Sequence, residues 1–294
     1  MSNGWSLFII IGTLGSLVGM LWLLAANRSQ PGPEPGTTGH VFDGIEELEN
    51  PLPRWWLGMF VGTIVYAVGY LIYYPGLGSF AGIAGWSSQS QWAEDVRARE
   101  ARFAPLYAEI AGLPLDELFS DRQAQQIGRR LYLNNCSTCH GLTAQGAFGF
   151  PDLTDQQWLW GDTFDAIKAS IQLGRTGAMA AWGPALGDSG VVEVSHYVAG
   201  LAGGEHDAGL ATLGKTHFAI FCIACHGPEG TGNQTLGAPD LTNGIWLYGG
   251  TPDQLAFTVR HGRNGIMPAH LDLLGEDRTH ILAAYIASLR ASGD

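Results

Sequence analysis

The sequence predicts an all-α protein in which two membrane-spanning helices precede two tandem copies of one small helical module. Three observations support this prediction. Two stretches of about 20 residues in the N-terminal part carry no charge, which is the length of a bilayer-spanning helix. A Cys-x-x-Cys-His segment occurs twice, 86 residues apart. Further short segments recur 88 residues apart, which indicates an internal duplication.

The composition excludes several classes of protein. Of the 294 residues, 46% are hydrophobic and 14% are charged, so the chain is not intrinsically disordered. The 42 glycines follow no three-residue period, which excludes collagen. The net charge of −12 argues against a nucleic-acid partner, because phosphate binding needs a basic face.

The first uncharged stretch runs for 22 residues, from Trp5 to Ala26. A cleavable signal peptide would begin with a basic region and have a shorter apolar run. Here the first basic residue is Arg28, after the apolar run. We therefore predict a first transmembrane helix within residues 1–28.

The second uncharged stretch runs from Trp55 to Tyr74 and has tryptophans at one end and tyrosines at the other. Such aromatic belts mark the two surfaces of a membrane. A buried helix of a soluble domain is disfavoured, because no charge occurs between Arg54 and Glu94. We predict a second transmembrane helix over residues 55–78.

The connection between the two predicted spans sets their orientation. Arg28 and Arg54 are the only basic residues near the span ends, so the positive-inside rule places the 29–54 linker in the cytoplasm and all that follows residue 75 outside it. The linker opens with a flexible or extended Pro/Gly stretch, residues 31–36. Residues 40–53 then carry four acids. This segment is either a solvated loop or a surface that docks onto another subunit.

After a connector, residues 79–121, which is partly helical over 91–118, the chain divides into two homologous modules, 122–203 and 208–292. Each module begins with a helix before its cysteine pair and ends with a closing helix. We expect the four helices at Ala124–Asn135, Val191–Leu201, Leu213–Phe221 and Arg278–Leu289.

The Cys-x-x-Cys-His segment is the attachment signature of c-type haem. Two thiols three positions apart bond one edge of the macrocycle, and the following histidine reaches the iron. A zinc site would need two cysteine pairs about 15–20 residues apart, and a redox dithiol would need a βαβ context. Two local disulfides fit the residue types less well than a duplicated motif with histidine both times. We expect two covalent haem c groups, on Cys136, Cys139 and His140 and on Cys222, Cys225 and His226.

The second axial ligand of each iron is predicted to be methionine. Met179 and Met267 are the only methionines outside the membrane part, and they occupy matching repeat positions. We expect each to serve the histidine of its own module, His140 and His226, because sulfur opposite imidazole raises the iron potential. A role as core filler is the alternative. The other candidate ligands lack histidine at the repeat-equivalent position and are His196, His206, His217, His261, His270 and His280.

A repeated arginine and a repeated tryptophan are candidates for contact with the haem propionates. Arg175 and Arg263 match in the repeat, as do Trp158 and Trp246. A guanidinium suits a carboxylate. A solvated arginine and a packing tryptophan fit the sequence equally well, so both interpretations stay open.

Taken together, the chain resembles the di-haem subunit III of cbb3-type cytochrome c oxidase, the CcoP/FixP family, over nearly its whole length. The specific features are Asp43-Gly44-Ile45-Glu46, the stretch from Asn50 to Trp56, and Trp-Leu-Trp-Gly and Trp-Leu-Tyr-Gly in the modules. The resemblance implies two class I cytochrome c domains. One departure is Met179-Ala180 where the second module has Met267-Pro268.

The resemblance also implies a role. The chain would lie in the bacterial inner membrane with its haems in the periplasm. It would take electrons from a soluble cytochrome c and pass them, through a mono-haem c subunit, towards a haem–copper subunit that reduces oxygen and pumps protons. It would thus be an electron-transfer subunit with no oxygen-reducing site of its own. A stand-alone membrane-anchored di-haem carrier that serves another reductase or dehydrogenase is the alternative.

Overall fold

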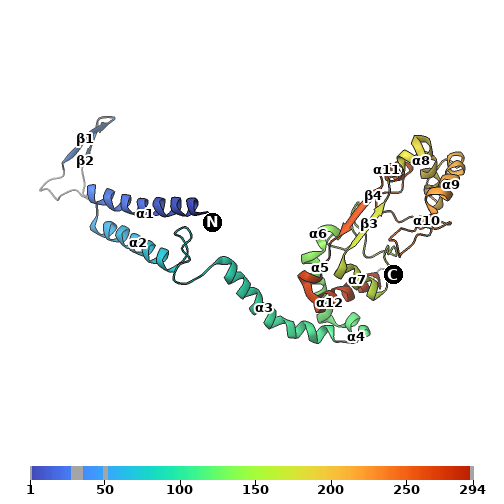
Figure 1. Ribbon diagram of the computed structural model, residues 1–294, viewed down its shortest axis with the longest axis horizontal. Coiled ribbons are helices and arrows are strands. Elements are labelled where there is room, and N and C mark those ends of the chain that lie inside the picture. The colour runs from blue at the N-terminus through green and yellow to red at the C-terminus, as the bar shows by residue number, and fades with distance from the viewer. Residues whose placement is uncertain (1, 28–35, 49–51, 292–294) are drawn as a thin grey trace. The chain divides into compact units, whose positions relative to one another are not determined.

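The computed structural model describes residues 2–27, 36–48 and 52–291, and the chain divides into two compact units, residues 1–102 and 103–294. The fold is mostly helical, which confirms the predicted fold class (Figure 1). Part of the topology and family argument depends on residues that lie outside the described ranges or at their edge. These are Arg28, the 31–36 stretch and Asn50-Pro51.

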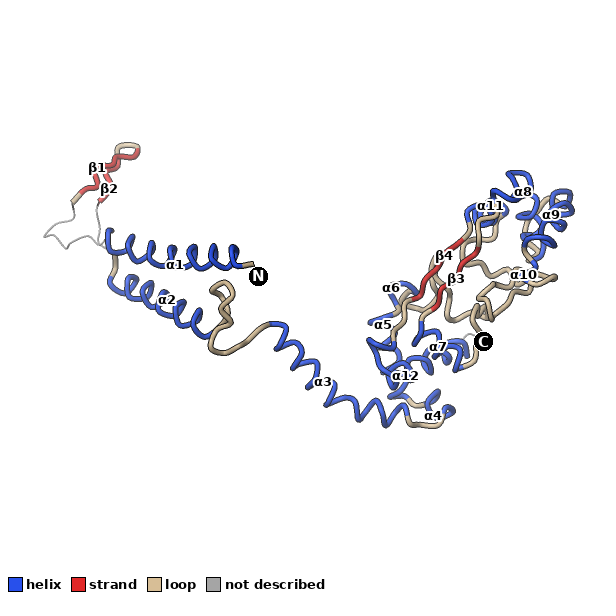
Figure 2. Tube along the Cα trace, viewed as in Figure 1, coloured by secondary structure: helices blue, strands red, loops and turns tan. Residues whose placement is uncertain are grey.

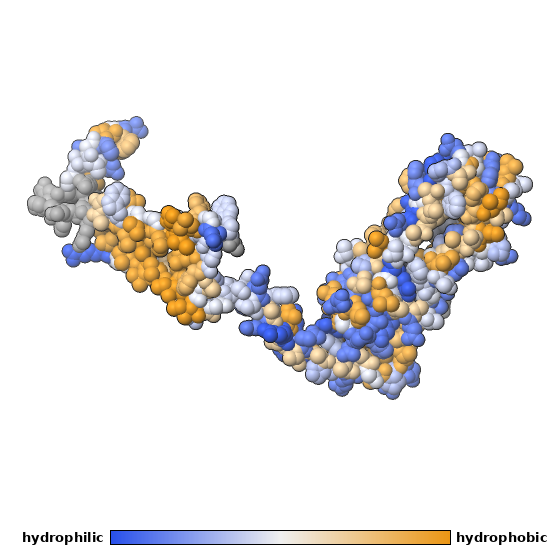
Figure 3. All heavy atoms as spheres, in the orientation of Figure 1, coloured by the Kyte–Doolittle hydropathy of each residue, from blue (hydrophilic) through white to orange (hydrophobic). Residues whose placement is uncertain are grey.

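The first unit holds the two predicted spans, helices α1 (Asn3–Ala26) and α2 (Arg54–Tyr73). Both are long and apolar enough to cross a bilayer, and they bury 0% and 6% of their most apolar stretch within the protein. The space-filling view shows a continuous hydrophobic surface over them (Figure 3). Apolar side chains left uncovered by protein are what a lipid-facing helix requires.

The two helices run antiparallel. The backbone N–H of Ser79, beyond α2, donates to Ser6 Oγ in α1 at 2.9 Å. Gly78 has φ +60° and a side chain there would overlap Ser6, so glycine allows this close approach. At the other end, Leu23 of α1 and Asn27, the residue that follows α1, line a small apolar cavity together with Phe60 of α2. The start of α1 and the segment after α2 therefore lie at the same end of the helix pair.

Between the spans the chain forms a β-hairpin of strands β1 (Thr37–Phe42) and β2 (Ile45–Leu48), which the sequence analysis treated as a loop (Figure 2). The turn residues Asp43 and Gly44 both have positive φ, 48° and 83°. This is the conformation of a two-residue type I′ turn, for which Asp-Gly is a favoured sequence. The Asp-Gly pair was the signal that could have predicted the hairpin.

Helix α3 (Ser88–Ala111) and α4 (Leu115–Ser120) form the connector, as the partly helical pattern predicted. Each module then repeats one order of elements. These are α5 (Arg122–Asn135), α6 (Ser137–His140), α7 (Phe164–Leu173), β3 (Arg175–Met179) and α8 (Gly183–Leu201), followed by α9 (Ala208–Phe221), α10 (Ile223–His226), α11 (Pro252–His261), β4 (Arg263–Met267) and α12 (Leu271–Ala291).

Local sequence explains where the main helices begin. Asp121 and Asp207 accept hydrogen bonds from the third residue on, at 2.7 and 2.8 Å, and so cap α5 and α9. Thr163 and Thr251 cap α7 and α11 in the same way. Equivalent caps at equivalent repeat positions show that the duplication reaches the level of single hydrogen bonds.

The packing of the helices does not follow the order of the repeats. Helix α5 and helix α7 of the first repeat pack on α12, the closing helix of the second. Helices α9 and α11 of the second repeat pack on α8, the closing helix of the first. We call residues 103–174 and 267–291 the first lobe, and residues 179–262 the second lobe.

The two homologous modules, residues 122–203 and 208–292, therefore exchange their closing helices in the fold. The physical reason is that the two closing helices are homologous, so each can cover the helices of either repeat. The chain crosses between lobes at strands β3 and β4, which pair antiparallel with Arg175 opposite Met267 and Met179 opposite Arg263. The crossing is visible as the two paired arrows between the helical groups (Figure 1).

Two glycines allow the closest helix crossings. A side chain at Gly128 of α5 would overlap Tyr285 of α12, and one at Gly214 of α9 would overlap the backbone of Glu193 in α8. The two glycines are repeat equivalents, 86 positions apart. This close contact sets the distance between each closing helix and the helix that it covers.

We expect Gly214→Ala to destabilise the second lobe by about 1–3 kcal/mol, the usual cost of overpacking, because the obstructing atoms are backbone and cannot rotate away. Thermal unfolding of the purified chain measures the change. Gly177→Ala is the matched control, because nothing lies within 4 Å of a methyl group there. Equal stability of the two variants would contradict the exchanged packing of α8 and α9.

Candidate haem sites

Each cysteine pair lies where a long helix ends and a single helical turn follows. Cys136 ends α5 and Cys222 ends α9, and both thiols are turned into the hydrophobic cores. Cys139 and Cys225 are exposed, and none of the four forms a disulfide. One inward and one outward thiol on the same turn can bond two points along one edge of a flat ligand.

The surroundings of the thiols disfavour a redox dithiol. Burial, with a smaller contribution from the neighbouring cysteine, raises the pKa of Cys136 to about 11 and that of Cys222 to about 11. Thiol–disulfide exchange requires a thiolate, which reactive cysteines obtain through a lowered pKa. The two pairs therefore fit covalent attachment to a cofactor better than thiol redox chemistry.

Both motif histidines are held by a backbone carbonyl. The Nδ1 atom of His140 lies 3.0 Å from the carbonyl oxygen of Pro151, and that of His226 lies 3.1 Å from the carbonyl oxygen of Pro239. In the neutral tautomer Nδ1–H donates to this oxygen, which leaves the Nε2 lone pair for a metal. Burial also lowers the pKa of His226, so that imidazole stays neutral.

The sequence analysis had not assigned a role to Pro151 and Pro239. Their signal was the repeated Pro-Asp-Leu-Thr segment. In both copies the aspartate accepts from the backbone N–H and the hydroxyl of the threonine two residues on, for example Asp152 from Thr154 at 2.7 and 2.6 Å. This turn holds the proline carbonyl in front of the histidine.

Each methionine packs in the core that holds the other repeat's cysteine. Met267 lies against the cluster that contains Cys136 and Tyr132, and Met179 lies against the cluster that contains Cys222. We expected His140 to share an iron with Met179, and His226 with Met267. In the fold, each methionine instead packs in the core next to the cysteine of the other repeat. The physical reason is the crossing of β3 and β4, which carries each methionine into the opposite lobe.

The repeated arginines rest on aromatic rings of their own repeat. The guanidinium carbon of Arg175 lies 5.0 Å from the ring centre of Trp160, and that of Arg263 lies 4.1 Å from the ring centre of Tyr248. The indole N–H of Trp158 donates to the carbonyl of Asp155 at 3.2 Å. The arginines thus contact the third residue of the Trp-Leu-Trp-Gly and Trp-Leu-Tyr-Gly segments, and the contact of Arg175, Arg263, Trp158 and Trp246 with haem propionates stays a prediction.

The other histidines mostly have protein partners. His217 Nε2 lies 2.9 Å from Glu193, and His196 Nδ1 accepts from the backbone N–H of Asp207 at 3.0 Å. The ring of His280 packs edge-on against Phe164, with the ring centres 4.9 Å apart. His270 differs, because its Nδ1 is buried and has no hydrogen-bond partner among the described residues.

The donor set in each lobe fits a covalently held haem. Each lobe offers two thiols on one turn, an imidazole with Nε2 available, and a thioether in the same core. His270, three residues after Met267, adds a buried polar atom that needs a partner. Soft sulfur and imidazole donors are the ligands that haem iron takes in electron carriers.

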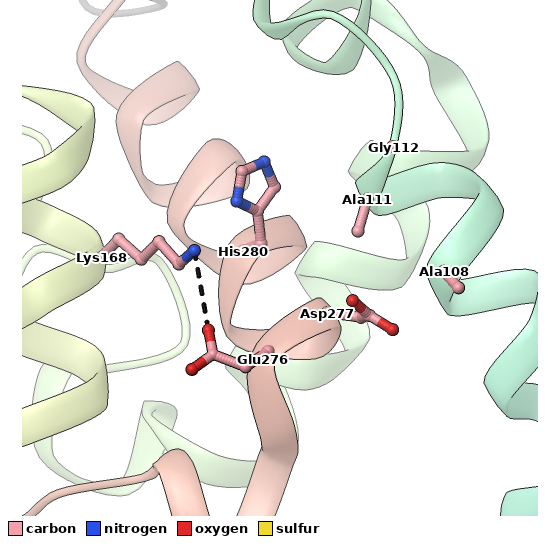
Figure 4. A pocket seen from close by; sticks show the side chains of 7 residues that line it. All are labelled: Ala108, Ala111, Gly112, Lys168, Glu276, Asp277 and His280. Atoms are coloured by element: carbon pink, nitrogen blue, oxygen red, sulfur yellow. Dashed lines mark ion pairs between the residues drawn. The ribbon is translucent and has the colours of Figure 1, made fainter.

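A separate cavity of about 210 Å³ lies in the first lobe, between the end of α3, α7 and α12 (Figure 4). It is lined by Ala108, Ala111, Gly112, Lys168, Glu276, Asp277 and His280. Lys168 Nζ lies 3.7 Å from Glu276 Oε2 across it. No predicted cofactor residue lines this cavity, so it is distinct from the haem site of that lobe.

Two family profiles match the chain. The N-terminal domain of cytochrome oxidase-cbb3, FixP, matches residues 34–81, and cytochrome c oxidase, cbb3-type, subunit III matches residues 123–198 and 209–286. The first match begins after α1, and the second occurs once in each repeat.

Whole-chain relatives agree with the profiles. The cbb3-type cytochrome c oxidase subunit CcoP of Rubrivivax gelatinosus is 44% identical over 98% of this chain and 95% of its own length. The FixP subunit of Azorhizobium caulinodans is 38% identical over 87% and 93%. CcoP of Cereibacter sphaeroides is 37% identical over 89% and 97%. The chain is therefore a member of the CcoP/FixP family, a membrane-anchored electron-transfer subunit of a cbb3-type cytochrome c oxidase that works through haem c.

Proposed function

We propose that the chain carries two covalently bound haem c groups, one in each lobe. Cys136 and Cys139 hold the first and Cys222 and Cys225 the second. The observation that carries this proposal is the matched pair of hydrogen bonds at Nδ1 of His140 and His226, which support Nε2 as the atom available to a metal. When bound, each haem would supply one-electron redox chemistry, and a histidine and a methionine of this chain would hold its iron.

The exchanged cores indicate which sulfur serves which histidine. Met267 serves His140 in the first lobe, and Met179 serves His226 in the second. Each haem site is then completed by both repeats. Arg175 and Arg263 lie next to these methionines in the β3–β4 ladder, where their charge is placed to hold haem propionates.

The partners follow from family membership and charge. The chain accepts electrons from a soluble cytochrome c and passes them to the mono-haem c subunit, which serves the haem–copper subunit. Residues 79–294 contain 13 basic and 22 acidic residues, a net charge of −9. An acidic surface steers a basic donor protein into contact and binds it only transiently. No observation favours a stand-alone carrier over this role in the oxidase.

The location is the bacterial inner membrane, with both lobes in the periplasm. The antiparallel helix pair supports this, because the start of α1 and the segment after α2 lie at one end of the pair. Arg54, at the start of α2, lies at the opposite end, and basic residues favour the cytoplasmic side. The 29–54 linker is then cytoplasmic.

The ligand pairing has a direct test in double variants. His140→Ala with Met267→Ala removes both axial ligands of one haem and should leave the other haem with sulfur and imidazole ligands. The matched control, His140→Ala with Met179→Ala, should leave neither haem intact. We measure the number of haems that bind carbon monoxide and the red charge-transfer band of sulfur-ligated haem. One intact haem in the control instead would show that each repeat supplies its own methionine.

A variant of a single methionine tests ligation through the redox potential of each haem. Met179→Ala should lower the potential of one haem by a few hundred mV, within the span of about 0.8 V that axial ligands cover. The other haem should keep its potential in a redox titration. Unchanged potentials for both haems would contradict methionine ligation in that lobe.

The topology is tested with a reporter enzyme that is active only in the periplasm. A fusion after Asp294 should be active, and a fusion within the hairpin, after Gly44, should be inactive. The physical basis is the even number of spans before the lobes. The reverse pattern of activities would contradict the orientation.

The acidic surface predicts a salt dependence. Oxidation of a basic cytochrome c by the purified oxidase should slow as ionic strength rises from about 0.01 to 0.15 M, since the Debye length falls from about 30 to 8 Å. Oxidation of a small neutral reductant is the control and should change little. Equal salt dependence for both reductants would contradict electrostatic steering.

A further inference from the structure

The hairpin β1–β2 is a formed element to which electron transfer assigns no role. Its register places Phe42 opposite Ile45 and Val41 opposite Glu46. The type I′ turn at Asp43-Gly44 fixes this register, so the positions of the side chains at the tip are defined.

The hairpin exposes nearly all of its apolar side chains. Phe42 is 69% exposed, Ile45 75%, Val41 61% and Leu48 54%. Among the described residues its two strands pair only with each other, so both outer edges are open. A two-stranded hairpin alone in water is marginally stable. We therefore expect another surface to cover the apolar tip and the unpaired strand edges of the hairpin.

The hairpin is tethered near the membrane surface. Five residues separate Leu48 from Arg54, the first residue of α2. The Cα atoms of Leu48 and Arg54 are therefore at most about 22 Å apart. The surface that covers the hairpin must therefore lie near the start of α2. This start is at the end of the helix pair opposite to the Ser6–Ser79 contact.

The charge of the hairpin selects the kind of partner. Residues 36–48 contain Asp43, Glu46 and Glu47 and no lysine or arginine. The cytoplasmic leaflet is anionic and repels such a segment, which disfavours a lipid surface. The cytoplasmic loops of multi-span membrane proteins carry an excess of lysine and arginine. These loops are complementary in charge to the hairpin and lie at the height that it can reach.

We propose that the hairpin of residues 37–48 docks onto basic cytoplasmic loops of a multi-span subunit of the same oxidase. Phe42 and Ile45 fill an apolar seat between those loops. Glu47, on the same face of β2 as Ile45, and Glu46, on the opposite face, meet lysines and arginines on either side of the hairpin. The proposal rests on the proposed topology, which puts the hairpin in the cytoplasm. It gives the membrane unit an attachment that is independent of the haem lobes.

The first experiment is photocrosslinking in cells that assemble the whole oxidase. A photoreactive phenylalanine analogue replaces Phe42, and adducts are recovered through a tag on this chain and identified by mass spectrometry. We expect an adduct with a cytoplasmic loop of a multi-span oxidase subunit. Trp92, 69% exposed on α3, is the control position and should not give this adduct. An adduct only with lipid, a second copy of this chain or a soluble protein, or no adduct, overturns the proposal.

The second experiment measures retention of the partner. Phe42→Asp should reduce the multi-span subunit recovered with the tagged chain in mild detergent about tenfold, as loss of an interface anchor can do. Thr37→Asp adds the same charge to the same hairpin and should leave recovery unchanged. Covalent haem per chain serves as the fold control for both variants.

The readouts separate this proposal from the proposed function. Full haem content with unchanged recovery for Phe42→Asp overturns the docking and leaves the haem assignment intact. A wild-type chain without covalent haem overturns the haem assignment and leaves the docking test unaffected. Exchange of Glu46 and Glu47 for lysine should weaken recovery in the same direction as Phe42→Asp, and improved recovery would overturn the charge argument.

Discussion

The packing of each closing helix against the opening helix of the other repeat is the interaction on which both lobes depend. Gly128 and Gly214 let the backbones meet at these crossings, and the buried clusters of both lobes are built around them. Each lobe is small, and a domain of that size buries limited surface by itself. The helices that each lobe takes from both repeats must therefore be in place before the cysteine turn and the methionine share one core.

The crossing of β3 and β4 turns a duplicated chain into one interlocked unit. Because Met179 and Met267 lie at the ends of these strands, the same ladder that joins the lobes also carries into each lobe the methionine that we propose as an iron ligand. Trp160 and Tyr248 reinforce the join: Trp160 packs against Gly237, and Tyr248 contacts Phe148 of the first lobe with ring centres 5.7 Å apart. A rigid spacing between two redox centres is what a short electron relay requires.

The chain thus combines three kinds of environment, each with its own physical demand. The spans expose apolar side chains of the kind that lipid covers, the hairpin exposes Phe42 and Ile45, for which we propose a protein partner, and the lobes hold sulfur and imidazole groups that fit a cofactor. In the proposed function, the acidic charge of residues 79–294 adds long-range attraction for a basic donor without fixing a permanent contact. In this proposal, the spans and the hairpin hold the chain in the oxidase, whereas the acidic surface makes brief contacts with an electron donor.

The sequence by itself determined the local chemistry: two uncharged spans, the duplicated Cys-x-x-Cys-His turns, the repeat register and the candidate ligands, because each depends on residues close together in the chain. Even the missed hairpin had a local signal in Asp43-Gly44. Only the tertiary structure decided which closing helix covers which lobe, and so which methionine accompanies which histidine. Homologous repeats present equivalent surfaces, and a pattern of residues cannot distinguish packing within a repeat from packing between repeats. The carbonyls of Pro151 and Pro239 were hidden for a related reason, since a backbone acceptor has no residue type of its own and gains its role from where the fold places it.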